Sequence, residues 1–441
     1  MKHLVYFVST LIFVSVPISL WASPLEIFEF EARGSAMGGA MTASANDYTA
    51  VLYNPGALTQ SKKLTTGFGL LSSLPQVSLS LEKTGQDKAS SPLEPSRRHG
   101  ISLGLSTPLG GGIGDRFAFG IGIYAPFAHS LRGEILAPQA PQFYRYQNRP
   151  DRFVGLTALA FEVTDWLSIG VGASLLADLV GRVRLDLRVS ERRVVSQSAR
   201  VDFPLKLTPT AGLLITPFAG FKLGLSWRKD TMLDFKIPSM LAVDDAIELE
   251  FDVDGIVLYS PETYALGVSY MTTGWRTLVS LDVLWTRWSK APDPSLRINV
   301  NADGPLLAAL GVEDRLDIQG RSSIDLAFQD IIQYKIGVEQ TLTKQLVIRT
   351  GYHFRPAPAP LPTGAYNYLD PSSHRASVGI GIQLSESDNP SARTVSLDLA
   401  YAATVIPPVN IVQRSGPLDP VGDFTANATV HSINASVLHT F

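Results

Sequence analysis

The feature that most constrains this chain is an alternation of apolar with small or polar residues that runs from about Thr65 to Phe441. Between residues 117 and 124, Phe and Ile occupy the odd positions, whereas the even positions carry Ala, Gly, Gly and Tyr. Alternate residues of a β-strand lie on opposite faces, so the pattern predicts strands with one apolar and one small or polar face. The same split recurs in ranges 101–106, 222–228, 264–270, 346–355 and 377–384.

The surroundings of these strands are not decided by the alternation, because a soluble β-sandwich alternates too. Three features favour a membrane: an export signal, long apolar faces, and aromatic residues near the ends of the segments, as in the aromatic girdles of membrane barrels. In a bilayer only a helix or a closed barrel satisfies every backbone group, and spanning helices need repeated apolar runs of about 20 residues. The sequence therefore predicts an all-β transmembrane antiparallel barrel. The predicted girdle residues are Trp166, Trp227, Trp275, Trp285, Trp288, Tyr352 and Phe354.

The one long apolar run lies at the N-terminus, from Leu4 to Leu20. Lys2 and His3 precede it and Trp21-Ala22-Ser23 follows it, which is typical of a secretory signal peptide cut after Ala22. A retained membrane anchor is the alternative. Since the 441 residues include no Cys, the exported chain has no disulfides and must rely on a hydrogen-bonded framework.

Composition and short motifs argue against several other classes. With 37 basic and 40 acidic residues and no basic block, the chain does not resemble a nucleic-acid binder. Gly100-Ile101-Ser102-Leu103-Gly104 matches the nucleophile elbow of hydrolases, but it lies within strand alternation and not at a strand-to-helix turn. The seven His are scattered without metal-ligand spacing. We expect no enzyme activity, no metal and no cofactor.

The mature chain divides into two parts, with the boundary near residue 64. Residues 23–64 form the first part and residues 65–441 the barrel, whose length permits 12 to 16 strands. Residues 126–150 break the alternation and carry Pro, Phe and Tyr, so we expect a long, partly helical outer loop there. Similar loops are expected at 237–256, 290–320, 355–373 and 405–427.

The first part is rich in small residues, and Asn54-Pro55-Gly56 is a strong turn signal. Small residues allow backbone to pack closely in a confined space, as a plug inside the lumen requires. An N-terminal extension outside the barrel is equally compatible with this composition.

The stretch from Ala32 to Ala40, then Ala45-Asn46-Asp47 and Tyr53-Asn54-Pro55-Gly56-Ala57-Leu58, resembles the N-terminal signature of the FadL/TodX family of outer-membrane transporters of long-chain fatty acids and other hydrophobic compounds. The sequence departs from that signature at Gly56, where Ala is usual, and at Asn46, where an acid is common. The resemblance spans most of the mature chain but is sharp only in residues 32–58. It identifies these residues as a hatch: Gly34, Gly38, Gly39, Asn46, Asp47, Asn54, Pro55 and Gly56.

The resemblance implies a 14-stranded barrel in the Gram-negative outer membrane, plugged by the hatch. A hydrophobic ligand, either a fatty acid or a hydrocarbon, would be captured by a groove in the outer loops and reach an interior pocket. Hatch movement and a kink in one strand would release it sideways into the outer leaflet. The implied partners are this ligand, outer-membrane lipid and the barrel-assembly machinery.

Two sets of residues are candidates for ligand binding. Arg228, Arg349 and Arg355 occupy lumen-facing positions, where a carboxylate ligand needs a charged partner. Ion pairing with neighbouring acids is the alternative. The apolar residues of the 126–150 loop could line the outer groove or pack on one another: Phe127, Leu131, Ile135, Leu136, Phe143 and Tyr144.

Three functions remain open from the sequence. Uptake of hydrophobic compounds leads, a general porin for polar solutes is second, and a structural or adhesive surface protein is third.

Overall fold

The computed structural model describes residues 29–441 except 82–96, 128–130, 133–140, 144, 147–150, 178, 189–192, 203–204, 244–246, 273, 293–296, 304–317, 322–324, 364–365, 386–392 and 413–420. The predicted signal peptide and the Ile135, Leu136 and Tyr144 candidates lie outside these residues. Among the described residues, no helix is both long enough and apolar enough to cross a membrane.

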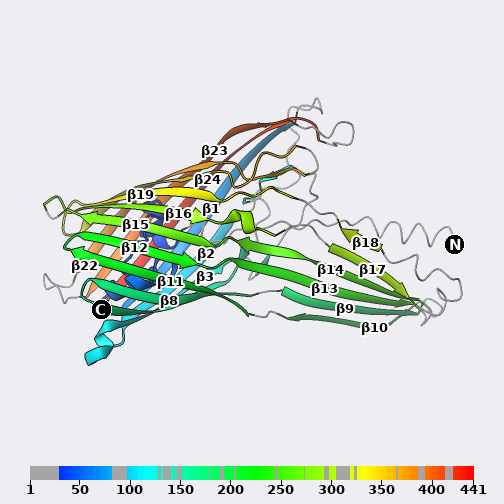
Figure 1. The fold of residues 1–441 in the computed structure, drawn as a ribbon, viewed down its shortest axis with the longest axis horizontal. Coiled ribbons are helices and arrows are strands. Elements are labelled where there is room, and N and C mark those ends of the chain that lie inside the picture. Colours follow the sequence, from blue (N-terminus) through cyan, green and yellow to red (C-terminus); the bar gives the residue numbers. More distant parts are fainter. Residues whose placement is uncertain are drawn as a thin grey trace.

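Fourteen antiparallel strands close into a barrel, which confirms the predicted fold and the implied strand number (Figure 1). The last strand pairs with the first over its whole length, from Thr65 opposite Thr440 to Leu81 opposite Phe424. The barrel strands, in order around the wall, are β1 (Thr65–Leu81), β2 (Arg98–Pro108), β3 (Phe117–Pro126), β7 (Val154–Thr164), β8 (Leu167–Ala177), β11 (Leu205–Phe218), β12 (Phe221–Arg228), β15 (Thr263–Met271), β16 (Thr277–Thr286), β19 (Ile331–Thr341), β20 (Leu346–Arg355), β22 (Ser373–Ser385), β23 (Thr394–Ile411) and β24 (Phe424–Thr440).

The alternation of the sequence corresponds to the two faces of this wall. In β3 the residues Ala118, Gly120, Gly122 and Tyr124 are buried toward the lumen, whereas Phe117, Phe119, Ile121 and Ile123 are more exposed. Large apolar side chains lie exposed on strands all around the wall, as a barrel surrounded by acyl chains requires. They include Leu103, Leu159, Val171, Leu225, Leu266, Leu281, Ile348, Ile380, Leu399 and Ile433.

Beyond one end of the barrel stands a second sheet of six strands, which we call the outer sheet (Figure 1). The C-terminus lies at the opposite end of the barrel. The strands of the outer sheet, in order, are β10 (Arg193–Asp202), β9 (Leu179–Arg188), β13 (Thr231–Val243), β14 (Ile247–Ser260), β17 (Arg297–Asp303) and β18 (Ile318–Arg321). The expectation of a loop at 237–256 was therefore wrong, and β17 and β18 likewise occupy parts of 290–320.

The backbone register of the outer sheet is regular across four strands. One row pairs Leu185, Leu241, Leu249 and Ala302, and another pairs Ile237, Val253 and Ile298. The row next to the first pairs Arg184, Met240, Glu250 and Asn301. Residues 237–256 are therefore part of a continuous hydrogen-bonded sheet.

The remaining elements are short. Two pairs of two-residue strands lie in the outer loops: β4 (Leu131–Arg132) with β6 (Asp151–Arg152), and β5 (Gln142–Phe143) with β21 (Tyr368–Leu369). The described residues of 126–150 thus include strands but no helix, in contrast to the expected partly helical loop. The helices among the described residues are α3 (Glu31–Ala36), α4 (Ala50–Tyr53) and the 3-10 helices η1 (Pro55–Gln60), η2 (Gly112–Arg116) and η3 (Trp288–Lys290).

One predicted girdle residue was wrong. Trp166, Trp275, Trp285 and Tyr352 are exposed, but Trp288 is only 2% exposed. It lies in η3, after β16 has ended, and packs against Tyr259 and Phe328. The alternation that governs a strand no longer applies there, so the residue turns inward.

Candidate functional site

Residues 29–61, which we call the inner segment, lie inside the barrel, and almost all of them are buried (Figure 1). The segment contains α3, α4 and η1, joined by turns. Its first helix packs against β20, β22, β23 and β24, whereas η1 packs against β7, β8 and β11 on the other side. The segment thus crosses the lumen from one part of the wall to another.

Glycines on the lumen face of the wall make room for this segment. At each of them an added Cβ would run into the inner segment. They are Gly67 and Gly104 beside Tyr48, Gly120 and Gly122 beside Val51, Gly170 beside Pro55, Gly212 beside Asn54, Gly224 and Gly267 beside Thr42, Gly337 beside Met37, Gly351 beside Gly38, and Gly379 beside Ala36. The small residues that alternate with apolar ones along the barrel strands therefore form a packing surface for the inner segment.

The turn at Asn54-Pro55-Gly56 joins the inner segment to the wall. The Asn54 side-chain amide donates to the carbonyl of Thr42 at 2.8 Å and to that of Leu213, in β11, at 3.0 Å. Its Oδ1 accepts from the backbone N–H of Gly56 at 3.0 Å, while Pro55 begins η1. One buried side chain thus holds its own turn, an earlier part of the segment and a barrel strand.

Three of the four candidate hatch glycines, Gly34, Gly38 and Gly39, lie at tight approaches. Gly38 and Gly39 have φ angles of +63° and +75°, which disfavour residues with a side chain. A Cβ at Gly38 would also meet the backbone of Tyr352 at 2.8 Å. Gly34 lies against the Tyr53 hydroxyl, so these glycines let α3 contact both β20 and α4.

The candidates Asn46 and Asp47 make polar contacts within the segment. Asn46 Oδ1 accepts from Arg33 Nη1 at 2.9 Å. Asp47 Oδ1 accepts from the backbone N–H and the hydroxyl of Thr49, at 2.8 and 2.5 Å. Asp47 therefore fixes the turn that leads into α4, and Asn46 belongs to the surroundings of Arg33.

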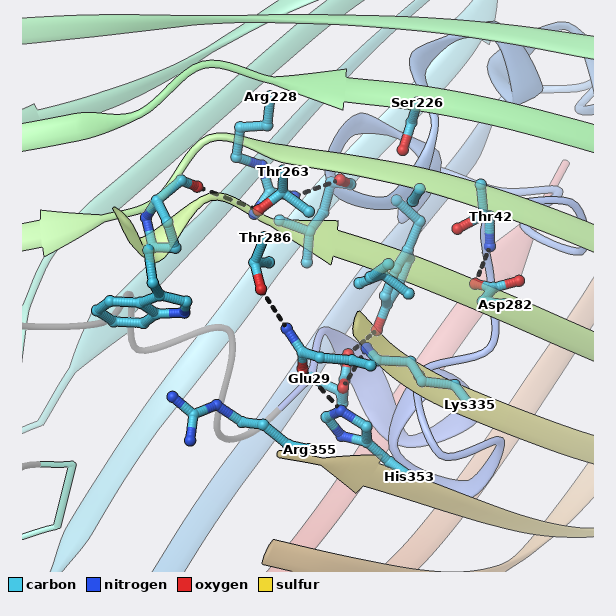
Figure 2. Close-up of a pocket in the computed structure, with 18 of the residues that line it drawn as sticks. Glu29, Thr42, Ser226, Arg228, Thr263, Asp282, Thr286, Lys335, His353 and Arg355 are labelled. Carbon is cyan, nitrogen blue, oxygen red and sulfur yellow. Dashed lines mark hydrogen bonds and ion pairs between the residues drawn. The ribbon is translucent and has the colours of Figure 1, made fainter. Parts of the chain in front are cut away.

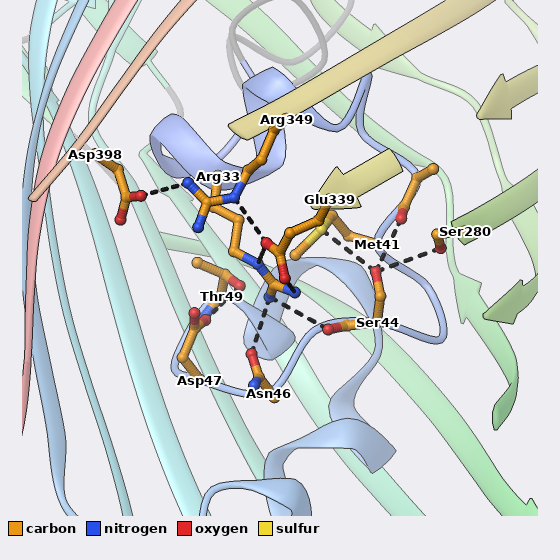
Figure 3. A network of polar contacts seen from close by, with 11 residues as sticks. Arg33, Met41, Ser44, Asn46, Asp47, Thr49, Ser280, Glu339, Arg349 and Asp398 are labelled. Carbon is orange, nitrogen blue, oxygen red and sulfur yellow. Dashed lines mark hydrogen bonds and ion pairs between the residues drawn. The ribbon is translucent and has the colours of Figure 1, made fainter. Parts of the chain in front are cut away.

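Arg33 belongs to a network of charged side chains between the inner segment and the barrel wall (Figure 3). Its Nε lies 2.8 Å from Glu339 Oε2 in β19, and the same oxygen lies 2.7 Å from Arg349 Nε in β20. Arg349 also pairs with Asp398 in β23. Candidate Arg349 is therefore engaged by two acids, as the ion-pair alternative proposed. The network lines a polar cavity of about 460 Å³, together with Lys62, Lys63 and Thr440.

On the other side of the inner segment lies a smaller cavity of about 90 Å³ (Figure 2). Candidates Arg228 and Arg355 line it together, whereas Arg349 does not. Arg228 donates to the Leu52 carbonyl at 2.8 Å. Arg355 makes a two-point pair with Asp370, at 2.8 and 2.6 Å. Ligand pockets typically measure about 300–1,000 Å³, so a lipid-sized ligand would need this cavity to expand.

Sequence reasoning missed several charged residues of this cavity. Lys335 in β19 lies 2.9 Å from Glu29 of the inner segment, and Asp282 in β16 accepts from the Thr42 backbone N–H at 2.9 Å. Both Lys335 and Asp282 occupy the small or polar positions of their strands, so the rule that selected the arginines applies to them as well. Glu29 and Arg145, which also line the cavity, lie outside the alternating segments and gave no such signal.

The apolar loop candidates do not form one cluster among the described residues. Phe127 is 60% exposed, whereas Phe143 is completely buried in the core. Leu131 lies in β4, and Phe143 lies in β5.

The motif serine Ser102 lies within β2 and donates to Glu31 Oε1 at 2.5 Å. Within the described part of the chain, no group of three His, Asp or Glu side chains could hold a metal ion.

Glu262 forms a second polar cluster at the rim between the barrel and the outer sheet. Its carboxylate accepts from Lys290 Nζ, Trp227 Nε1, Tyr264 Oη and Arg287 Nη1, all within 3.0 Å. The hydrogen bonds from Lys290 and Trp227 lower the pKa of Glu262 to about 2. The cluster thus ties the start of β15 to the ends of β12 and β16.

Comparison with known proteins gives consistent results. No family model matches the chain. Alkane uptake protein A of Marinobacter nauticus is 24% identical over 422 residues, which cover 89% of this chain and 86% of that protein. Structures of a Pseudomonas aeruginosa FadL homologue and of the P. putida toluene transporter TodX each match with a TM-score of 0.58 at 14% identity, covering 93% of this chain and 98% of theirs. The Ralstonia pickettii toluene transporter TbuX matches with a TM-score of 0.51 at 16% identity, covering 93% and 97%.

These matches confirm the resemblance seen in the sequence. Together with the closed barrel and its apolar outer surface, they confirm the predicted location in the Gram-negative outer membrane.

Proposed function

We propose that this chain, which has the fold of the FadL/TodX outer-membrane transporters, takes up hydrophobic compounds such as long-chain fatty acids or hydrocarbons. One observation carries the proposal: the barrel is apolar outside, while its lumen is filled by the buried inner segment. A pore for polar solutes gains nothing from such a filling. A related protein is named for alkane uptake, and two structures of the same fold are named as toluene transporters.

Capture would begin on the outer sheet, where apolar residues of β13, β14 and β17 stand opposite one another beyond the barrel and a hydrophobic solute arrives from outside. Of the loop candidates, Phe127 is 60% exposed and would add to this surface, whereas Phe143 is buried. This first contact needs only apolar area, because hydrophobic attraction has no directional requirement.

Interior binding would follow in the cavity beside Arg228 and Arg355. Both guanidinium groups line it, so an acidic head group entering the cavity would meet positive charge. An uncharged hydrocarbon would use the space without that contact. The small size of the cavity supports a mechanism in which the inner segment rearranges as the ligand binds.

Release would be sideways into the outer leaflet, with the inner segment acting as the hatch. Its gating residues would be Gly34, Gly38, Gly39, Asn46, Asp47, Asn54, Pro55 and Gly56. The cavity on the other side of the segment is lined by Arg33, Glu339, Arg349 and Asp398, which is a poor environment for an apolar solute. Membrane lipid would receive the product, and the barrel-assembly machinery would insert the chain during biogenesis.

A general porin for polar solutes remains the second candidate, because both cavities are lined by charged side chains. Steady ohmic conductance of the protein in planar bilayers would support that candidate.

The proposal is tested by uptake of labelled oleate and labelled hexadecane into Gram-negative host cells that lack their own transporter. The Asn54→Ala/Pro55→Ala variant should change uptake while the barrel still assembles, as judged by its heat-modifiable migration on a gel. Unchanged uptake by the assembled variant would count against the hatch, and no uptake by the unmodified protein would overturn the proposed function.

A further inference from the structure

Trp288 stands between the cavity of about 90 Å³, which we call the interior cavity, and an apolar cluster. Its side chain lines the interior cavity together with Arg228 and Arg355 (Figure 2). The same side chain belongs to a buried apolar cluster whose other members are Ile256, Tyr259, Leu326, Ile331 and Tyr368. Among the described residues, Trp288 is the one that lines the cavity and also belongs to this cluster.

The apolar cluster extends to the outer sheet, where the proposed capture begins. Ile256 and Tyr259 belong to β14, and Met232 of β13 packs against the cluster. Tyr259 and Trp288 are 1% and 2% exposed, so water does not reach this contact. The cluster thus forms an apolar connection from the sheet to the interior cavity, and a compound that follows it meets the indole of Trp288 last.

The backbone around Trp288 is fixed by polar contacts. Glu262 accepts from Arg287 Nη1 at 3.0 Å and from Lys290 Nζ at 2.9 Å, so it holds η3 on both sides of the tryptophan. The backbone N–H of Ser289 donates to Asp330 Oδ1 at 3.0 Å. Movement at this position is therefore expected from the side chain and not from the helix.

The contacts of the indole are of a different kind. Its ring centroid lies 6.0 Å from that of Tyr259 and 5.2 Å from that of Phe328. The Arg355 guanidinium lies 5.8 Å from the indole and is itself held by Asp370. Dispersion contacts do not require a particular partner, so an entering apolar compound can replace them. The indole can thus turn aside while η3 stays in place.

We propose that Trp288 selects which compounds enter the interior cavity, because its indole must turn aside for each of them. The inference rests on the proposed function. A linear alkane is narrow and needs only a small displacement of the indole. A fused-ring compound needs the space that the indole itself fills, and the cavity behind it, about 90 Å³, leaves little room to accommodate the displaced ring. The unmodified chain should therefore favour linear compounds.

The test compares two compounds in one preparation. Outer-membrane vesicles that contain the protein are given labelled hexadecane and labelled pyrene, a fused-ring hydrocarbon, and the ratio of their transfer rates is measured. Trp288→Phe removes part of the side chain, and Trp288→Ala removes most of it. Trp285→Ala is the matched control, because Trp285 is 43% exposed and stacks on Tyr264 on the outer wall.

The pyrene-to-hexadecane ratio should rise from the unmodified protein through Trp288→Phe to Trp288→Ala. We expect a rise of about tenfold for the alanine variant, since even one methylene group in a pocket changes selectivity by about that much. Trp285→Ala should leave the ratio unchanged. A purely structural role of Trp288 would change both rates together, and an unchanged ratio in the folded variants would overturn the proposal. Failure of the unmodified protein to transfer either compound would instead overturn the proposed function.

A second measurement leaves Trp288 in place. The other five of the six tryptophans are replaced by Phe, and fluorescence is recorded for this variant after it has been shown to transfer hexadecane. Bromohexadecane should quench Trp288, whereas a brominated detergent, which surrounds the outer wall, should not. A variant that keeps only Trp285 should be quenched by both. Absence of quenching of Trp288 by bromohexadecane would overturn the proposal.

Discussion

Asn54 is the single residue on which the closed state most directly depends. Its amide satisfies the carbonyls of Thr42 and Leu213 and its oxygen satisfies Gly56, so three parts of the structure meet at one buried side chain. Leaving buried polar groups without partners costs about 1–3 kcal/mol. Loss of the Asn54 hydrogen bonds would therefore cost enough free energy to displace the hatch, while the barrel of fourteen strands stays folded.

Asn54→Ala should therefore loosen the turn at η1. We expect more frequent current fluctuations in planar bilayers than for the unmodified protein, with unchanged barrel assembly. Asn410→Ala is the matched control, because the Asn410 side chain accepts an exposed hydrogen bond from Thr425. Equal traces from Asn54→Ala and the control would contradict the assignment.

Glu262, at the rim of the barrel, makes the stability of the fold depend on pH. Its pKa in the folded protein, about 2, lies below the ordinary value of 4.5 because Lys290 and Trp227 hydrogen-bond the ionised form. A group whose pKa is depressed by folding contributes its full stabilisation at pH values above its pKa in the unfolded chain. This contribution is lost as the pH falls from about 4.5 through about 2. Glu262→Gln should lower the melting temperature at pH 7, and the difference from the unmodified protein should shrink toward pH 2. A difference that does not change with pH would contradict this origin.

At the scale of elements, α3 is held by a network that joins three barrel strands. Glu339→Gln removes the acid shared by Arg33 and Arg349 and leaves two buried cations short of a partner. Removal of one member of a buried pair typically costs about 3–5 kcal/mol. We expect faster proteolysis of the inner segment in detergent, as measured by cleavage N-terminal to residue 65. Asp165→Asn is the control, because Asp165 is 94% exposed in its pair with Arg116. Equal cleavage of the two variants would show that the network does not anchor α3.

The strands of the barrel were largely predictable from the sequence, because lipid on one side and a packed segment on the other impose a strict period of two. In β20 the lumen-facing set of Val347, Arg349, His353 and Arg355 was read correctly from spacing alone. The outer sheet was not foreseen. Residues 237–256 were expected to form a loop, whereas pairing between strands, some of them distant in the sequence, makes this region regular.

The candidate site was less predictable, for a physical reason. Alternation tells which residues face the lumen but not which acids lie opposite them on other strands. Arg349 and Arg355 were selected as ligand partners on equal grounds, yet Arg349 faces Glu339 and Asp398 and Arg355 faces Asp370. The turn at Asn54 was found because its residue types define its local geometry.

The whole molecule is a barrel whose lumen the inner segment fills, and the proposed function requires it to be closed to ions and permeable to apolar solutes. The glycines on the lumen face are the structural basis of that closure, since the inner segment packs directly on the wall backbone. Gly212→Leu should therefore displace the turn at Asn54 and give an ohmic leak in planar bilayers, because its side chain would occupy the place of the Asn54 oxygen. Ala403→Leu, on the outward face of β23, should give none. A sealed Gly212→Leu barrel would show that the closure has another basis.

A paired transfer measurement on the unmodified protein distinguishes uptake of hydrophobic compounds from a pore for polar solutes. Outer-membrane vesicles with and without the protein are given labelled hexadecane and labelled sucrose together, and the transfer of each is followed over time. We expect the protein to accelerate the transfer of hexadecane and to leave that of sucrose unchanged. Accelerated sucrose transfer with no effect on hexadecane would contradict it.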